Sequence, residues 1–419
     1  MAQLTVADVV AALDARYPPS TAQDWDAVGL VCGDPGSTVT HVRFAVDPVL
    51  DVVAEAGADG VDLLVTHHPL LLRGVTAVPT TDPRGLVVTR LLRAGIALVV
   101  AHTNADVARP GVSDALADVL GVSPDGLLPL VPRPAAALDA LAVYVPVGSA
   151  GAVRTALAGA GAGRLGDYTE ASFSSDGTGR FRPGPAAHPA VGSVGRLAEV
   201  AETRVEVVLP RSRRAAVLAA MRAAHPYEEL AFDLHEMAAS PGRTGLGRVG
   251  ELPVPVPLAA FADRVAAAVP ATTAGVRVAS GGGTDGGADG QRLVRRVAVS
   301  GGSGDSLLEA AADAGADVFV TADLRHHPVS AFLASTAPPR KRPALVEVTH
   351  WASEWPWLPA AARLLAADLA ADLAADLAAD PTAGLAAHPG AGPRPGTEGP
   401  LRVDVSALVT DPWTMTAGR

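Results

Sequence analysis

Hydrophobic and polar positions in the first 130 residues alternate between two periods. Short apolar runs at 40–47, 61–68 and 96–103 predict buried strands, whereas 48–59 and 85–95 carry apolar residues at helical spacing. Buried strands separated by amphipathic helices are typical of an α/β layer with a largely parallel sheet. We therefore expect residues 1–132 to form an α/β unit.

The pattern changes near residue 133, after a proline-rich stretch. Segments 141–163 and 204–226 each read as a strand followed by a helix, which favours a small ferredoxin-like α+β module. We expect an inserted domain at 133–242, after which the α/β rhythm resumes over 243–419. Within that last part, the low-complexity stretch 365–400 predicts a helix extension followed by a linker.

The two α/β parts resemble each other. Residues 52–69 and 308–328 each read as a helix, a strand ending in threonine, and then His-His-Pro. The sequence therefore predicts an α/β fold of two related halves with mixed, largely parallel sheets around a pseudo-twofold axis, plus the inserted module.

A second pair of similar segments follows the two copies of this repeat. A strand delivers His102 and then Asp106 in the first half, and another delivers His350 and then Glu354 in the second. A spacing of four residues places both side chains on one face of a helical turn. Ligand sites in such sheets lie beyond the carboxyl ends of the strands, so we expect these side chains to meet there.

Histidines and carboxylates at strand ends predict a metal centre. His67 and His68 can diverge at the end of their strand and each reach one of two metals about 3.5–4 Å apart, bridged by Asp106 or Glu354. Imidazole and carboxylate ligands suit two divalent transition metal ions per chain, whether Zn, Fe, Mn or Co. Such metals would activate a water for hydrolysis. The predicted ligands are His67, His68, Asp106, His350 and Glu354.

Other residues receive weaker assignments. His102, His327 and Asp323 are expected to support the ligands or to contact a substrate. The alternative is that strand-end histidines only form hydrogen bonds. The loop 300–306 (SGGSGDS) can hold an anion on its backbone amides, but a tight strand–helix turn is the favoured interpretation.

Composition narrows the classes of function. The net charge of −11 argues against a nucleic-acid partner. Cys32 is the only cysteine, which excludes an intrachain disulfide and a zinc–thiolate cluster. We expect no signal peptide and no membrane span, and hence a cytoplasmic protein acting on a small-molecule substrate.

The motifs together resemble those of the Nif-three-like dinuclear-metal family, whose members are named GTP cyclohydrolase I type 2 homologs. The resemblance rests on WDAVGL, THHPL, AHTNAD, GLGRVGEL, SGGSGDS, TADLRHHP and THWASEWPWL. It implies the same five ligands, a toroidal homohexamer, and an inserted domain similar to PII or CutA-type modules. Ala27, Ala322 and Ala171 stand where the family usually has Asn, Gly and Cys, and Ala171 weakens any idea of thiol chemistry.

Two functions remain open from the sequence. The first is a metal-dependent hydrolase, for which the family name suggests opening of the GTP ring. The second is a non-enzymatic metal-handling or regulatory scaffold, with the inserted domain as a docking or sensing module. A fold and a pair of metals host many reactions, so the name alone does not decide between them.

Overall fold

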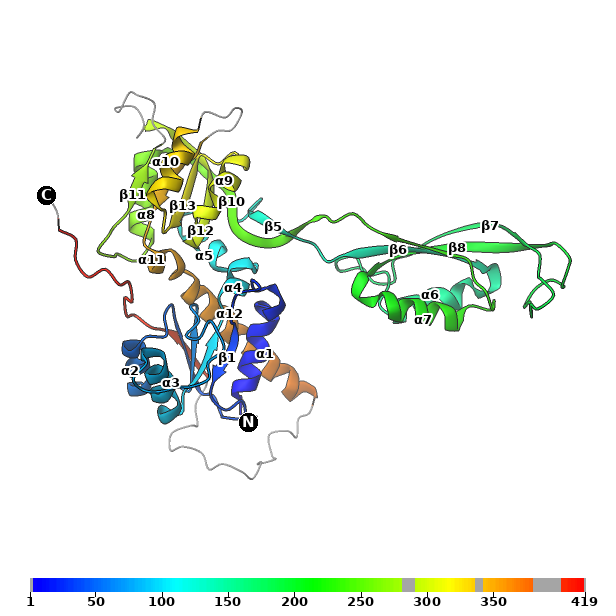
Figure 1. The fold of residues 1–419 in the computed structure, drawn as a ribbon, viewed down its shortest axis with the longest axis horizontal. Coiled ribbons are helices and arrows are strands. Elements are labelled where there is room, and N and C mark those ends of the chain that lie inside the picture. The colour runs from blue at the N-terminus through cyan, green and yellow to red at the C-terminus, as the bar shows by residue number, and fades with distance from the viewer. Residues whose placement is uncertain (1–2, 281–290, 336–341, 380–400, 418–419) are drawn as a thin grey trace. The chain divides into compact units, whose positions relative to one another are not determined.

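A computed structural model describes residues 3–280, 291–335, 342–379 and 401–417 (Figure 1). The chain forms two compact units, one of residues 1–132 with 243–419 and the other of residues 133–242. The larger unit contains two sheets of mixed parallel and antiparallel strands with helices packed on them, and the expected α/β class is confirmed.

The first sheet has the strand order β1-β4-β3-β2-β15. Strands β4, β3, β2 and β15 run parallel, and β1 is antiparallel to β4 at the edge. All residues of β2, β3 and β4 are buried, as expected for parallel strands that are covered on both faces. The elements are α1 (Val6–Arg16), β1 (Gly29–Cys32), β2 (His41–Ala45), α2 (Leu50–Ala58), β3 (Leu63–Thr66), α3 (Pro83–Ala94), β4 (Ala97–Val100), α4 (Thr103–Val107), α5 (Val112–Val119) and β15 (Arg402–Val405).

The second sheet repeats the centre of the first. Its order is β11-β14-β13-β12-β10-β5, with β14, β13 and β12 parallel and β11 antiparallel at the edge beside β14. In both sheets three adjacent parallel strands lie next to an antiparallel edge strand, and the first sheet has β15 as a fourth parallel strand. The elements are β5 (Leu128–Pro134), β10 (Pro241–Pro257), α8 (Leu258–Ala268), β11 (Arg277–Ala279), β12 (Leu293–Ser303), α9 (Leu308–Asp313), β13 (Val318–Ala322), α10 (His326–Ala334), β14 (Ala344–Glu347), α11 (His350–Glu354) and α12 (Trp357–Ala379).

Local sequence explains where these elements begin and end. The Asp82 side chain accepts from the backbone amides of Arg84 and Gly85 at the start of α3, and Pro83 occupies the first turn. The same helix ends at Gly95, which adopts a left-handed conformation at φ 68°. Because α3 ends tightly, the chain enters β4 directly. Strand β4 then places His102 at the carboxyl end of the parallel strands.

One hydrophobic core joins the two sheets. It contains Phe44 from β2, Val320 from β13, and Trp357, Leu365 and Leu369 from α12. Figure 1 draws α12 in orange between the elements of the two sheets. The LAAD repeat is helical as far as the end of α12, and residues 380–400, where a linker was expected, lie outside the described part.

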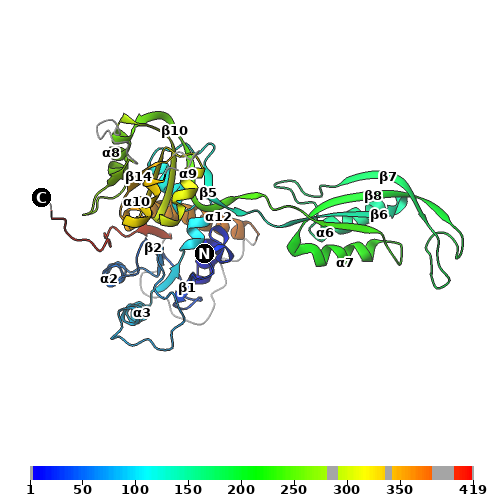
Figure 2. The same cartoon turned by 45° about the horizontal axis from the view of Figure 1, so that its top comes forward.

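The smaller unit is a four-stranded antiparallel sheet of order β7-β8-β6-β9. In chain order it reads β6 (Leu138–Pro146), α6 (Ala150–Gly159), β7 (Phe173–Phe181), β8 (Ala198–Pro210), α7 (Arg214–Ala224) and β9 (Phe232–Glu236). Helices α6 and α7 lie side by side on one face of this sheet in both views (Figure 1, Figure 2). The unit has its own hydrophobic core, separate from that of the larger unit.

No helix in the described residues combines the length and the apolar character that crossing a bilayer requires.

Candidate metal centre

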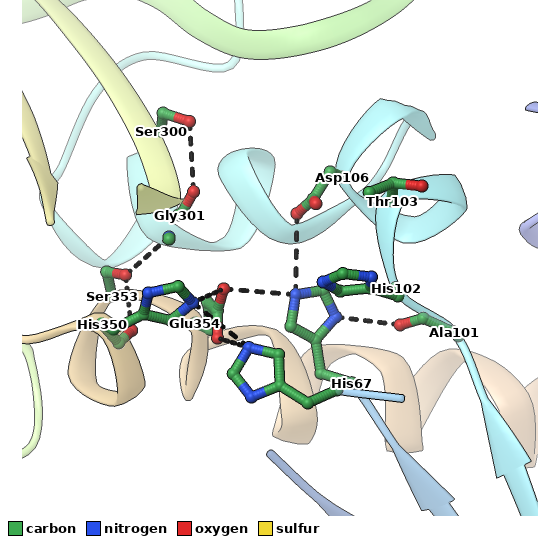
Figure 3. Close-up of polar contacts among 12 residues, drawn as sticks. His67, Ala101, His102, Thr103, Asp106, Ser300, Gly301, His350, Ser353 and Glu354 are labelled. Atoms are coloured by element: carbon green, nitrogen blue, oxygen red, sulfur yellow. Dashed lines mark hydrogen bonds and ion pairs between the residues drawn. The ribbon is translucent and has the colours of Figure 1, made fainter. Parts of the chain in front are cut away.

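The ends of parallel strands bring the predicted residues together. His67 and His68 follow β3, His102 follows β4, and His350 opens α11 just beyond β14. Figure 3 shows Glu354 between His350 and His67. As expected, the chain turns helical at both places: α4 begins at Thr103, directly after His102, and α11 runs from His350 to Glu354.

Each histidine of the cluster is held through its Nδ1 atom. That atom lies 2.9 Å from the Ala101 carbonyl oxygen in His67 and 2.7 Å from Asp47 Oδ1 in His68. The corresponding partners are Asp26 Oδ1 at 2.9 Å for His102 and Asp323 Oδ2 at 2.6 Å for His350. Carbonyl and ionised carboxylate oxygens only accept hydrogen bonds, so each Nδ1 must carry the proton. In a neutral ring, Nε2 is then the atom with the free lone pair.

The Nε2 atoms converge on one another. His68 Nε2 lies 3.2 Å from His350 Nε2. Two unprotonated nitrogens at this distance repel each other, so the arrangement requires protons on the rings or a cation beside them. Histidines whose other ring nitrogen is fixed by a carboxylate or carbonyl are the usual arrangement around a protein-bound metal.

Glu354 completes the cluster from a position between His350 and His67 (Figure 3). Its Oε1 lies 3.0 Å from His350 Nε2 and 3.4 Å from His67 Nε2, and its Oε2 lies 3.0 Å from His68 Nε2. Among the described side chains, His67 Nε2 is a buried atom that makes no hydrogen bond. Buried polar atoms are rarely left unpaired, so this nitrogen is suited to a ligand that completes its coordination.

The electrostatics of the protein without metal indicate a site with displaceable protons. Although burial by itself lowers the pKa of the His68 imidazole, the carboxylates of Glu354 and Asp47 raise it to about 10. For His350, Glu354 and Asp323 likewise overcome the effect of burial and raise the pKa to about 11. The histidines in turn hold the pKa of the buried Glu354 carboxyl well below its usual range.

Asp106 and His102 behave differently from these groups. Burial, with a contribution from Glu354, raises the pKa of Asp106 to about 6. Asp106 Oδ1 lies 3.7 Å from His67 Nε2, too far for a hydrogen bond. Burial and the neighbouring His67 lower the pKa of His102 to about 4, so its Nε2 stays unprotonated at neutral pH.

Glycines make room for the second half of the cluster. A Cβ atom on Gly302 would lie 2.7 Å from Glu354 Oε1 and 3.3 Å from His350 Nε2, and the residue has a φ of 66°. Its backbone amide donates to Ser353 Oγ at 2.8 Å, and that hydroxyl donates to the His350 carbonyl at 2.7 Å. The SGGSGDS segment therefore lets the β12 end approach the two ligands closely.

The second His-His pair does not join the cluster. His327 is exposed on α10, and its ring contacts that of His326 at 5.2 Å. In the first half the histidine pair directly follows Thr66, whereas three more residues separate Thr321 and Ala322 from the second pair. Those residues begin with Asp323, which holds His350 Nδ1 from a left-handed conformation at φ 52°.

Two residues of the centre are not indicated by the sequence patterns. Asp26 stands within the WDAVGL motif without any visible role, yet its side chain is fully buried and holds both His102 Nδ1 and the Thr103 amide. Asp47 belongs to no motif, although it lies just beyond the carboxyl end of β2, as the histidines lie beyond the carboxyl ends of their strands. Its place at the end of a buried strand is the signal that can identify it.

The donor set fits divalent transition metals. Two groups of side chains have ligand atoms within 4.8 Å of one another, His67 with His68 and His102, and His68 with His350 and Glu354. The two groups together offer imidazole and carboxylate without thiolate, a set that Zn, Fe, Mn and Co accept. His102, expected to support the ligands, thus lies among the possible ligands themselves.

Known proteins resemble the chain along nearly its whole length. Proteins named GTP cyclohydrolase 1 type 2 homolog are 51% identical over 413 residues in Mycobacterium tuberculosis, covering 98% of this chain and 97% of the relative, and 39% identical over 310 residues in Bacillus subtilis, covering 74% and 80%. A crystal structure of a Bacillus cereus protein related to NIF3 matches with a TM-score of 0.69 at 30% identity, covering 99% of this chain and 100% of that one. Staphylococcus aureus SA1388 matches with a TM-score of 0.72 at 26% identity and the same coverage. The family model for Duf34/NIF3 (NGG1p interacting factor 3) matches residues 4–380, and the chain belongs to this family.

Proposed function

We propose that the protein is a dinuclear metal-dependent hydrolase. The observation that carries this proposal is the convergence of the Nε2 atoms of His67, His68 and His350 on the buried Glu354 carboxylate, at 3.0–3.4 Å. Imidazoles that are fixed through Nδ1 and converge through Nε2 on a buried carboxylate suit a divalent metal, which would displace the protons held there in its absence.

The proposed ligands are His67, His68, Asp106, His350 and Glu354. Glu354 is the proposed bridge, because its two oxygens face three histidines at 3.0–3.4 Å. Asp106 approaches only His67 among these histidines and is assigned to one metal. Asp47 and Asp323 fix the ring orientations of His68 and His350, so that both present Nε2 inwards.

His102 is the proposed contact between the centre and a substrate. Its ring packs edge-on against those of His67 and His68, with centroids 5.2 and 5.7 Å away. Asp26 fixes the ring and keeps Nε2 free to accept a hydrogen bond. Two metals held by these residues would supply polarisation of an electrophile and activation of a water, the chemistry of many hydrolases.

The decisive experiment measures metal and turnover in the same preparations. We expect the purified protein to hold about two transition metals per chain and to hydrolyse a nucleotide or phosphoester with a rate that follows metal content. Glu354→Ala should lose metal and turnover together, with Glu55→Ala, a distant carboxylate on α2, as the control.

Two outcomes would count against the proposal. Absence of bound metal above background across Zn, Mn, Fe and Co would overturn the metal centre. Full metal loading without turnover on GTP, other nucleotides or phosphoesters would instead support the metal-handling scaffold. The toroidal homohexamer, the cytoplasmic location and the PII- or CutA-like role of residues 133–242 stay predictions from the sequence.

A further inference from the structure

The chain continues past β15 into a segment that lies beyond residue 380, where the family match ends. We call residues 406–417 the C-terminal segment. It begins at Ser406, whose amide donates to the Phe44 carbonyl oxygen at 2.8 Å and whose hydroxyl donates to Glu55 Oε2 at 2.6 Å. The proposed metal ligands all lie outside this segment, so a role in the metal centre must act through other residues.

One residue of the C-terminal segment contacts the support of a proposed ligand. Thr410 Oγ1 bonds to Asp47 Oδ2, while Asp47 Oδ1 lies 2.7 Å from His68 Nδ1. An ionised carboxylate only accepts hydrogen bonds, so the threonine hydroxyl is the donor. Thr410 and Asp47 are 363 positions apart in the chain. Their contact therefore exists only when the C-terminal segment is docked beside the end of β2.

The two hydrogen bonds fix the Asp47 carboxylate in one orientation. A carboxylate that is bonded through one oxygen can still turn about its last side-chain bond, because this terminal torsion has a broad energy minimum. A second bond, made to the other oxygen by a different part of the chain, restricts that rotation. Asp47 then holds the His68 ring with its Nε2 3.0 Å from Glu354 Oε2.

The far end of the C-terminal segment is attached to the second half of the larger unit. Thr416 Oγ1 donates to the Thr273 carbonyl oxygen at 2.6 Å. The hydroxyl of the neighbouring Thr272 lies 3.2 Å from that of Thr349, which directly precedes His350. The segment therefore connects the two halves whose histidines face each other in the centre.

Between these two attachments, the C-terminal segment forms a wall of the cavity beside the centre. Thr410, Asp411 and Trp413 line this cavity of about 810 Å³, together with His68 and His350. Asp411 is only 9% exposed, and its Oδ1 accepts a hydrogen bond from the Trp413 amide at 3.0 Å. The segment thus has a defined local conformation where it passes the centre.

We propose that Thr410 is a positioning residue of the metal centre, and that it makes docking of the C-terminal segment and metal binding depend on each other. The route is one chain of hydrogen bonds, from the Thr410 hydroxyl through Asp47 to the His68 ring. Coupling between two binding events is reciprocal, so a docked segment favours metal and bound metal favours the docked segment. The inference rests on the metal centre of the proposed function but requires no hydrolysis.

Competition with a chromophoric chelator, with Zn²⁺ as the probe, tests the first direction of the coupling. Thr410→Val should lower Zn²⁺ affinity about tenfold, because losing an orienting partner outside the ligands costs about 10–100-fold. Thr410→Ser keeps the hydroxyl and should restore the affinity of the parent protein. Thr40→Val is the matched control, because Thr40 Oγ1 donates to Asp62 Oδ2 at 2.8 Å just before β2, at the opposite end of the strand from Asp47.

A double variant tests the route of the effect. Asp47→Ala should itself weaken Zn²⁺ binding about tenfold or more. In that background Thr410→Val should cause no further loss, because the carboxylate through which Thr410 acts has been removed. Additive losses would show that Thr410 acts by another route and would overturn its assignment. Thermal unfolding of each variant without metal checks that the fold is retained.

Hydrogen exchange in the full-length protein tests the second direction. Zn²⁺ should slow exchange of the amides of the C-terminal segment, among them that of Trp413, by about tenfold, and should slow it less in Thr410→Val. Unchanged Zn²⁺ affinity in Thr410→Val, or exchange in the segment that does not respond to Zn²⁺, would overturn this inference and leave the metal centre standing. A parent protein that binds none of Zn, Mn, Fe and Co would overturn the metal centre as well.

Discussion

The two halves of the larger unit share a sheet arrangement but contribute to the centre in different ways. The first half supplies His67 and His68 just after β3, while the matching strand β13 ends at Ala322 and is followed by Asp323. Asp323 serves the second half as the partner of His350, a task that Asp47 performs for His68 in the first. The same strand end thus delivers ligands in one half and an orienting carboxylate in the other.

The difference shows that the two halves keep polar side chains at equivalent strand ends, although these side chains have different chemical roles. Both halves place polar groups at the carboxyl edge of three parallel strands, where the topology leaves space for a ligand. The short helices α4 and α11 then present a carboxylate in each half, half-buried in Asp106 and fully buried in Glu354. The deeper second-half carboxylate faces three histidines and is the shared element of the site.

The largest expected effect is on metal affinity, and it comes from filling the space beside Gly302 in the second half of the larger unit. Gly302→Ala places a methyl group against Glu354 Oε1 and His350 Nε2, so we expect metal affinity to fall at least about 100-fold. Gly315→Ala is the matched control, because Gly315 has nearly the same φ of 68° but no heavy atom within 4 Å of the position that a Cβ would take.

Both glycine variants should lose about 1–2 kcal/mol of unfolding free energy from the left-handed backbone. Competition with a chelator and thermal unfolding measure the two effects separately. Equal metal affinity in Gly302→Ala and Gly315→Ala would contradict the assignment of His350 and Glu354 as ligands.

A smaller effect is expected from pH, and it distinguishes histidines within the centre. Without metal, His68 and His350 have pKa values near 10 and 11 and are protonated at neutral pH, whereas His102, near 4, is not. Metal must displace the protons of the first two, so its affinity should rise with pH between about 6 and 9, by up to about tenfold per pH unit for each proton released.

Calorimetry in buffers of different ionisation enthalpy counts the released protons directly, after correction for the buffer's own metal binding. Metal binding that releases no proton at neutral pH would mean that His68 and His350 are neutral beforehand, against the charge balance described above.

The smallest effect is expected at the second His-His pair. His327→Ala should leave metal content unchanged and alter unfolding free energy by less than about 0.5 kcal/mol, because the residue is exposed. His68→Ala, at the equivalent position of the repeat, should lose metal. Metal analysis of the two variants side by side tests whether the halves have diverged, and equal losses would show that they have not.

Periodicity and repeats are enough to predict the sheets and the strand ends that carry the centre. Strands β2, β3 and β4 lie within the short apolar runs that predict them. The segment from His350 to Glu354 is helical, as its spacing indicates. The sequence predicts that Asp323 supports the ligands, but the role of Asp26 cannot be predicted in this way, because Asp26 and His102 lie 76 positions apart and meet only through the packing of the first sheet.

The contribution of Gly302 is equally hidden in the sequence. Its glycine-rich segment suggests an anion loop or a tight turn, and neither interpretation anticipates a close approach to Glu354. Whether a glycine is needed for its φ or for the space beside it depends on what lies opposite, which local sequence does not specify.

Strand β15 has a consequence for synthesis of the protein. It pairs in parallel with β2, so residues near the end of the chain complete a sheet begun near its start. During translation the edge of β2 stays open until β15 has been synthesised, roughly tens of seconds later at about 5–20 residues per second. An unpaired edge strand invites association with other chains, and polypeptides from truncated messages would keep that edge exposed permanently.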